Sequence, residues 1–397
     1  MKLRVADAWK TVVEEGYRQQ MPLVHIRGRD QNWESHHVPI EGFFPYFLVR
    51  EQEWLELGEE VSADSRVLDV KRTDRRGRPE TAIDGECLFR VVCRTPGDVA
   101  DVRELFDDPF EADVLYPTRF LIDHDANQWI AVPDSATDAT VSDPIHVDDV
   151  SIGIDEEPAQ TPPLRLLTYD IEVAQGGSGP PVVSTEGCEQ VRNPITAISA
   201  HDSYTDEYRV WCLVHDDWRA DDAEAAREAV DCEVTLYANP RTIAGKFCEW
   251  IVERDVDALL AWAGSGFDHP YFFNWCQKNG VRSVYDVSPT GSVYEFDGDG
   301  KWINSSLKGR LLLDLMDMYE KCKVHSLDSK RLEDVAETEG VSVGKLDINS
   351  VIDVPRDEPA IDYARREHPA VFVEYALKDT ETAVAINRES QANVNIL

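Results

Sequence analysis

Two acidic side chains at the end of an apolar run are residues whose type and spacing suit metal chemistry. Asp170 and Glu172 lie in the run 166–173, LLTYDIEV, whose apolar and β-branched residues predict a β-strand. Residues two apart in a strand point the same way, so the two carboxylates face one side. Because like charges repel unless a cation lies between them, the pair is half of a site for a hard divalent ion. Taken alone, it is equally consistent with two surface residues.

A third carboxylate stands where a predicted strand meets a predicted helix. Residues 258–263 form an apolar run, and Pro270 marks the first turn of the following helix. This places Asp268 at or beside the N-cap of that helix. An isolated aspartate in this position is more often a cap for backbone N–H groups than a metal ligand.

A phenol and a fourth carboxylate share one face of the last predicted helix. The helix begins at Pro369, and Tyr375 and Asp379 lie four residues apart along it. That spacing stacks the two side chains about one turn from each other. Chance produces many such pairs, so this one does not identify a site by itself.

The elements that carry these residues alternate between strands and helices, which predicts an α/β sheet. We place this α/β domain at residues 164–397, after a connecting segment at residues 136–163 that is rich in Asp, Thr, Ser and Pro. Residues 1–135 are interpreted as a smaller, β-rich mixed domain with a short helix capped near Thr95. The expected fold class is therefore α/β with a β-rich N-terminal domain.

Two further apolar stretches are interpreted as strands. Residues 111–123 are dense in apolar and aromatic side chains and predict a core-forming strand and turn. Residues 310–319 predict a strand, which a helix at residues 329–339 follows, with Gly340 as its stop signal.

The composition indicates an acidic protein whose cysteines are free thiols and whose chain does not enter a membrane. The 397 residues include 76 Asp and Glu against 40 Lys and Arg, a formal charge of −36, and the acids are dispersed along the chain. Dispersed acidity favours solubility at high salt, so we expect a halophilic organism and a cytoplasmic location. The eight cysteines are scattered without a C-x-x-C pair, which disfavours structural zinc and a disulfide framework. No stretch is long and apolar enough to predict a membrane partner.

The three acidic motifs are more informative together than separately, because they occur in a particular order along the chain. Asp-x-Glu on a strand, Phe-Asp at a strand-to-helix junction and Tyr-x-x-x-Asp on a terminal helix together resemble the proofreading 3′–5′ exonuclease domain of family B DNA polymerases. Gly309-Arg310 leading to Asp314, and Ser326-Leu327, are similar to the linker between that domain's second and third motifs. In the N-terminal region, residues 44–47 and 111–123 are similar to the family's N-terminal domain. The resemblance thus covers nearly the whole chain.

The resemblance implies a ribonuclease H-like exonuclease domain and a set of functional residues. In that family pattern Asp170, Glu172, Asp268 and Asp379 bind two divalent ions, Mg²⁺ or Mn²⁺, with Asp170 shared between them. Tyr375 helps to orient the attacking water. The substrate is the single-stranded or frayed 3′ end of DNA, released as nucleoside monophosphates. Two ions suit this reaction because they stabilise charge on both the attacking and the leaving oxygen.

The sequence departs from the family pattern in two places. An asparagine usually stands five residues before the aspartate of the second motif, and here that position is Ala263, whose methyl group cannot hydrogen bond near the terminal nucleotide. The polymerase signatures Ser-Leu-Tyr-Pro, Asn-Ser-x-Tyr-Gly and Asp-Thr-Asp have no counterpart in these 397 residues. We therefore expect no DNA synthesis from this chain alone, and a separate polymerase chain is a candidate partner.

One segment runs against the acidic average. Between Lys301 and Arg331 the chain carries several cations together with Trp302 and Tyr319, the side-chain types that bind single-stranded nucleic acid. A solvated face with one structural arginine explains these residues equally well. The candidate DNA-contacting residues are Phe267, Lys308, Arg310, Lys321 and Lys323.

Other interpretations remain open at this level. The chain is a metal-dependent exonuclease, a non-catalytic DNA-binding module that kept the fold, or a subunit that docks a polymerase chain through an apolar patch within residues 383–397. Archaeal members of the family read template uracil in their N-terminal domain. The corresponding residues here, Val114-Leu115-Tyr116, differ from the usual Ile-Pro-Phe, which favours core packing.

Overall fold

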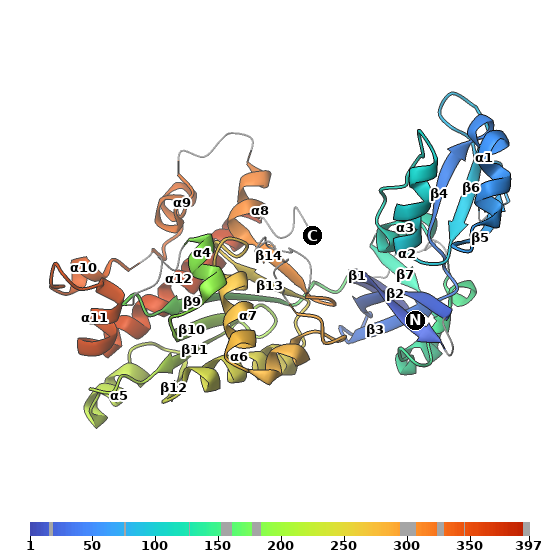
Figure 1. Cartoon of the computed structure of the whole chain (residues 1–397). Coiled ribbons are helices and arrows are strands. Elements are labelled where there is room, and N and C mark those ends of the chain that lie inside the picture. The colour runs from blue at the N-terminus through green and yellow to red at the C-terminus, as the bar shows by residue number, and fades with distance from the viewer. Residues whose placement is uncertain are drawn as a thin grey trace. The chain divides into compact units, whose positions relative to one another are not determined.

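The computed structural model describes residues 1–15, 19–74, 77–126, 128–151, 161–176, 184–293, 307–323, 329–344 and 346–391. The chain divides into two compact units, Met1–Pro163 and Leu164–Leu397 (Figure 1). Among the described residues, no helix combines the length and the apolar character that a membrane crossing requires.

Two sheets form the first unit. The larger has the strand order β7-β1-β2-β3-β8 and consists of β1 (Lys2–Glu15), β2 (Gln19–Arg29), β3 (Ser35–Glu41), β7 (Trp129–Ala131) and β8 (Ile145–His146). The smaller has the order β4-β6-β5 and consists of β4 (Tyr46–Arg50), β5 (Val67–Lys71) and β6 (Leu88–Cys93). Strand β8 lies in the segment that was expected to be a connector. It belongs to the larger sheet because Ile145 pairs with Ile40 of β3.

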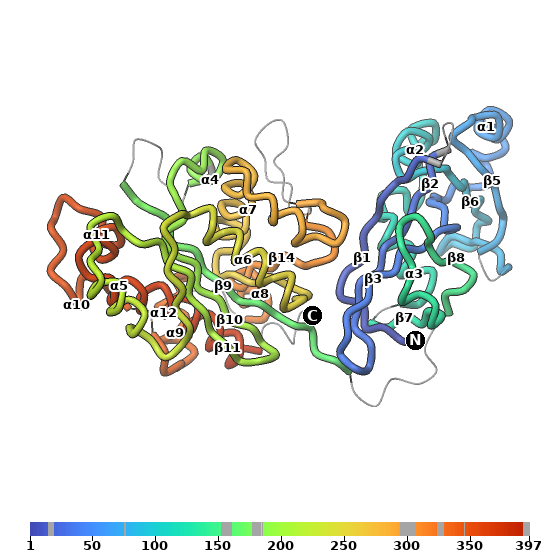
Figure 2. The backbone as a smooth tube through the Cα atoms, turned by 90° about the horizontal axis from the view of Figure 1, so that it is seen from below, coloured from blue at the N-terminus to red at the C-terminus, as the bar shows by residue number. Residues whose placement is uncertain are grey.

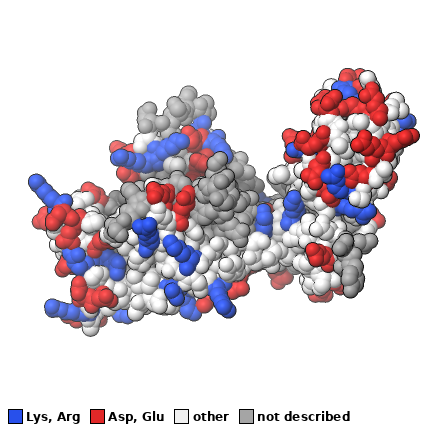
Figure 3. Space-filling view, viewed as in Figure 1, with Lys and Arg blue, Asp and Glu red and all other residues white. Residues whose placement is uncertain are grey.

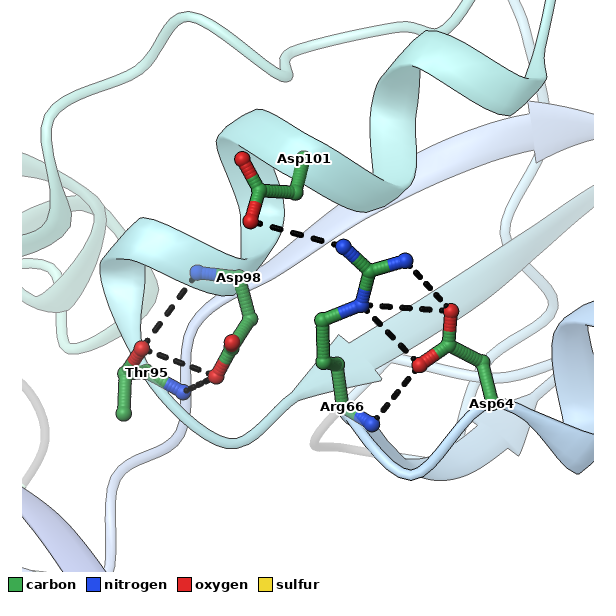
Figure 4. Close-up of polar contacts among 5 residues, drawn as sticks. All are labelled: Asp64, Arg66, Thr95, Asp98 and Asp101. Carbon is green, nitrogen blue, oxygen red and sulfur yellow. Dashed lines mark hydrogen bonds and ion pairs between the residues drawn. The ribbon is translucent and has the colours of Figure 1, made fainter.

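The helices of the smaller sheet are α1 (Glu51–Ala63) and α2 (Pro96–Val102), which pack on one of its faces. Helix α2 begins with a reciprocal cap (Figure 4): the Asp98 N–H donates to Thr95 Oγ1 at 3.3 Å, and the Thr95 N–H donates to the Asp98 carboxylate at 2.9 Å. Arg66 pairs with Asp64 and with Asp101 of α2. The predicted cap at Thr95 is confirmed.

The stretch at residues 111–123 is a helix at its C-terminal end, and the prediction of a strand was wrong there. Helix α3 (Tyr116–Asp123) has Pro117 in its first turn, where the missing N–H costs nothing. Tyr116, Arg119 and Phe120 are buried at helical spacing, and Leu115 and Ile122 are exposed. A dense apolar composition hid this 3.6-residue period.

The second unit is built on a six-stranded mixed sheet in the order β12-β11-β10-β9-β13-β14. Strand β9 runs antiparallel to β10 on one side and parallel to β13 on the other. The strands are β9 (Leu166–Val173), β10 (Ile195–Asp202), β11 (Glu207–Leu213), β12 (Glu233–Tyr237), β13 (Ala258–Ala261) and β14 (Leu311–Asp314). Strands β10 and β11 form an antiparallel hairpin.

Helices cover both faces of this sheet (Figures 1 and 2). On one face, apolar residues of β9 and β10 share a core with α6 (Pro240–Arg254) and α7 (Asp268–Lys278). On the other face, residues of β10 and β11 pack with α12 (Pro369–Ser390). The remaining helices of the unit are α4 (Thr185–Gln190), α5 (Ala220–Arg227), α8 (Leu315–Cys322), α9 (Leu332–Glu339), α10 (Ile348–Val351) and α11 (Ala360–Glu367).

The strand predicted at residues 310–319 has only four residues, Leu311–Asp314. Strand β14 ends at Asp314, whose side chain accepts the Asp317 N–H at 3.1 Å and so caps α8. Leu315, Met318 and Tyr319 are buried at helical spacing. The prediction was wrong because it gave more weight to the apolar run than to the capping aspartate.

Surface charge and thiols agree with the composition. Acidic side chains are distributed over the visible face of each unit (Figure 3). All eight cysteines are free thiols.

Candidate active site

The two carboxylates in the second half of β9 point to the same side of the sheet. Tyr169 and Ile171 lie in the core with α6 and α7. The alternate residues Asp170 and Glu172 therefore face the side on which α12 packs. Asp170 is half-buried and Glu172 is buried.

Helix α12 is held against β10 directly opposite Asp170. Ser199 of β10 is the ladder partner of Asp170. The Ser199 hydroxyl lies 2.6 Å from the Ala376 carbonyl oxygen and 2.6 Å from Thr380 Oγ1. All three residues are buried. This contact brings the neighbouring α12 residues to the carboxylates of β9.

Three carboxylates meet as a result. Asp170, Glu172 and Asp379 each offer an oxygen, and these oxygens lie within 4.8 Å of one another. Such a group of hard oxygen ligands suits Mg²⁺ or Mn²⁺. The sequence prediction that these residues share one site agrees with this geometry.

Tyr375 lies one turn before Asp379 on α12 and is buried. Burial raises the pKa of its phenol well above the usual range, and the nearby carboxylates Glu172, Asp379 and Asp170 raise it further. The phenol therefore stays protonated and keeps its O–H as a donor beside the acidic cluster.

Asp268 reaches the same strand from the opposite face. It is the first residue of α7, and Phe267 takes the N-cap position. Its Oδ1 accepts the Ile171 N–H at 3.3 Å. Burial raises the pKa of Asp268 to about 7, and the negative charges of Asp314 and Asp379 add to this shift. Asp268 is not one of the three residues whose oxygens lie within 4.8 Å.

Asp314 is a fifth carboxylate near the site and is buried, and it is absent from the site residues predicted from the sequence. It accepts the Ser265 N–H at 2.8 Å, in the turn that leads to Asp268. Burial raises its pKa. The signal was available, because Asp314 follows an apolar strand in the same way that Asp170 does.

The turn between β13 and α7 begins at Ala263. The Ala263 carbonyl oxygen accepts the N–H groups of Gly266 and Phe267 at 3.0 and 2.9 Å. These bonds use only the backbone, so the turn forms without the asparagine side chain of the family pattern.

The five candidate DNA-contacting residues lie in different environments. Phe267 is half-buried, with its ring 5.6 Å from that of Tyr271. Lys321 is exposed in the last turn of α8, and Lys308 is partly exposed. Lys323 forms an ion pair with Glu339. Lys301, Trp302 and the Ser326-Leu327 pair lie outside the described residues.

Arg310 has a structural environment instead. It is buried, and its guanidinium donates to the carbonyl oxygens of Val287, at 2.8 Å, and Val256. A third bond joins it to the Asp255 carboxylate at 3.3 Å. These contacts hold the start of β14 in place, so we remove Arg310 from the residues that we expect to meet DNA.

Comparison with known proteins decides the family. Residues 107–335 match the family model of the DNA polymerase family B exonuclease domain, which is more than half of the chain. The chain belongs to DNA polymerase family B. The matched residues of this family B chain include Asp170, Glu172 and Asp268 and end before Tyr375 and Asp379. The assignment of the two α12 residues therefore depends on the geometry.

Several polymerases are similar to the chain. The DNA polymerase of Pyrococcus glycovorans is 23% identical over 309 residues, which are 74% of this chain and 32% of that protein. The DNA polymerase delta catalytic subunit of Schizosaccharomyces pombe is 20% identical over 364 residues, 78% of this chain and 32% of that subunit. The chain spans about a third of the length of these relatives.

A solved structure shares the fold. The family B DNA polymerase from the hyperthermophilic archaeon Pyrobaculum calidifontis matches with a TM-score of 0.66 and 22% identity, over 98% of this chain and 45% of that one. The predicted fold class, an α/β exonuclease domain with a smaller β-rich domain, is confirmed.

The raised pKa of Asp268 predicts an unusual pH dependence for the metal-free protein. Between about pH 4 and pH 7 the folded state keeps a proton that the unfolded state has released. We therefore expect Asp268 to lower the free energy of unfolding as pH rises through this window. Denaturant unfolding in EDTA should show a shallower decline for Asp268→Asn than for the wild type. Equal slopes would contradict the prediction.

Arg310 and Lys321 should separate structural from exposed cations. Arg310→Met removes the hydrogen bonds of the guanidinium to two buried carbonyl oxygens, so we expect it to lower the free energy of unfolding by about 2 kcal/mol or more. The matched variant Lys321→Met changes an exposed side chain and should stay within about 0.5 kcal/mol of the wild type. Circular dichroism in urea measures both, and comparable losses in the two variants would refute this assignment.

Proposed function

We propose that this chain is a metal-dependent 3′–5′ exonuclease that hydrolyses DNA from its 3′ end to nucleoside monophosphates. The observation that carries the proposal is the convergence of Asp170, Glu172 and Asp379, whose oxygens lie within 4.8 Å of one another in a family B exonuclease domain. Asp268, which is bonded to the same strand, completes a set of four carboxylates.

The donor set fits two divalent ions. Asp170, Glu172, Asp268 and Asp379 offer only oxygen, the ligand that Mg²⁺ and Mn²⁺ prefer. Burial raises the pKa of Asp268, the charges of Asp314 and Asp379 raise it further, and a bound cation would offset both effects. When bound, the ions lower the pKa of an attacking water and stabilise charge on the attacking and leaving oxygens.

The protein side chains then hold and orient the reactants. Tyr375 keeps its proton and lies one turn from Asp379, so its hydroxyl is suited to orient the attacking water. Asp170, at the centre of β9, is the carboxylate that we assign to both ions. The buried strand and the docked α12 give these groups little freedom, which favours a defined geometry for attack.

The proposed substrate is a single-stranded or frayed 3′ end. Phe267 adjoins Asp268 and offers an aromatic ring for stacking, and Lys308, Lys321 and Lys323 offer charge for phosphates. Lys323 would have to leave Glu339 to do so, which makes it the weaker candidate. Contacts of this kind weaken as salt rises. A separate polymerase chain remains a candidate partner.

An exonuclease assay tests the proposal. Wild-type protein with Mg²⁺ or Mn²⁺ should release nucleoside monophosphates from a labelled single-stranded oligonucleotide, and EDTA should stop the release. Asp170→Asn should lower the rate by more than about a hundredfold, because loss of outer-shell partners already costs 10–100-fold at metal sites. Asp231→Asn makes the same change at an exposed loop position and should leave the rate unaltered.

The location of the label identifies the direction of cleavage. With a 3′-labelled oligonucleotide, labelled mononucleotide should appear from the start of the reaction. With a 5′-labelled oligonucleotide, the labelled strand should become shorter one nucleotide at a time. Folded wild type that releases nothing with either ion would refute the exonuclease proposal. It would favour a DNA-binding or docking role.

A further inference from the structure

A buried tyrosine and a buried histidine join the two segments that carry the carboxylates. Tyr169 precedes Asp170 on β9, and His269 follows Asp268 on α7. The Tyr169 hydroxyl lies 2.8 Å from His269 Nδ1. Both side chains are about 1% exposed. The bond crosses the core side of the sheet, opposite the face with α12.

The partners fix the direction of this hydrogen bond. His269 Nε2 lies 3.1 Å from the Leu313 carbonyl oxygen, which can only accept. Nε2 therefore carries the proton, Nδ1 is an acceptor, and the Tyr169 hydroxyl donates to it. Burial lowers the pKa of His269 to about 4, so the imidazole is neutral. Three elements, β9, α7 and β14, meet at this one ring.

A glycine in the turn before α7, Gly264, leaves room for the His269 imidazole. A Cβ atom on Gly264 would lie 2.5 Å from His269 Nε2 and 3.1 Å from the Leu313 carbonyl oxygen. Any side chain there would push the ring away from its acceptor. Tyr169 is fixed from its other side, with its ring 5.1 Å from that of Phe247.

The bond lies where the backbone ladder stops. Strand β13 pairs with β9 only as far as Leu260 and Thr168. Beyond that point two side-chain hydrogen bonds, Tyr169 to His269 and Asp268 to the Ile171 N–H, join α7 to β9, and the ring of Tyr169 also packs against that of Phe272. The location of Asp268 relative to Asp170 and Glu172 depends on these contacts.

We propose that Tyr169 and His269 are positioning residues, which hold Asp268 at the place where it completes the metal site. This inference rests on the proposed function, because it concerns the same four carboxylates. The two residues would not touch the ions or the DNA. They would set the affinity of the site by fixing the first turn of α7 against β9.

Mn²⁺ binding without DNA gives a readout apart from activity. We expect Tyr169→Phe to weaken Mn²⁺ binding by about tenfold, the scale at which residues behind metal ligands act. Isothermal titration calorimetry or the electron paramagnetic resonance signal of free Mn²⁺ measures this affinity. The exonuclease rate at a subsaturating Mn²⁺ concentration should fall in parallel and recover in part at high concentration.

Tyr271→Phe is the matched control on the same helix. Tyr271 is fully buried, and its hydroxyl donates to the Asn193 carbonyl oxygen at 2.7 Å. The Tyr271→Phe variant therefore loses a tyrosine hydrogen bond from the same core, as Tyr169→Phe does. We expect a similar fall in the thermal midpoint from the two variants, with Mn²⁺ affinity within about twofold of the wild type for Tyr271→Phe alone.

A second pair of variants guards against misfolding. His269→Gln keeps an acceptor for Tyr169 and a donor for the Leu313 carbonyl, and it should bind Mn²⁺ more tightly than His269→Leu, which has neither. Wild type that binds Mn²⁺ and cuts DNA, with Tyr169→Phe equal to Tyr271→Phe in affinity, would overturn the positioning role alone. Wild type that neither binds Mn²⁺ nor releases nucleotides would overturn both proposals.

Discussion

Repulsion among buried carboxylates is the constraint on which the second unit depends. Asp170, Glu172 and Asp379 converge on one point, with Asp268 and Asp314 close behind. Like charges held this close repel one another, so a chain free to relax would separate them. Contacts on both faces of the sheet resist that separation. The Ser199 hydroxyl fixes α12 on one face, and the Tyr169–His269 bond fixes α7 on the other.

The residues that make these contacts have no proposed part in metal binding or hydrolysis. Ser199 lies opposite Asp170 in the ladder, and Tyr169 and His269 are next to Asp170 and Asp268 in sequence. On β9 the alternation of a strand separates the two roles, because Tyr169 and Ile171 face the core while Asp170 and Glu172 face the other side. The site and its support are encoded in the same few residues.

Sequence reasoning succeeded where short-range periodicity decides the outcome. The period of two placed Asp170 and Glu172 on one face, and the four-residue spacing did the same for Tyr375 and Asp379. It failed where burial depends on distant segments. Arg310 was predicted to contact DNA, but its guanidinium binds the carbonyl oxygens of Val256 and Val287. No local sequence pattern links these residues to Arg310. The stretch at residues 111–123 and the end of β14 failed for another reason: apolar composition concealed a helical period and a cap.

The order of elements along the chain also determines when the site can exist. Asp170 lies in the first strand of the second unit, and Asp379 lies in the long helix that follows every other strand and helix described there. Contacts between residues so far apart in sequence form late, since the intervening loop must close first. During synthesis on a ribosome, Asp170, Glu172 and Asp268 emerge well before their last partner. The acidic cluster is therefore incomplete until α12 docks, and a nascent or truncated chain lacks Asp379.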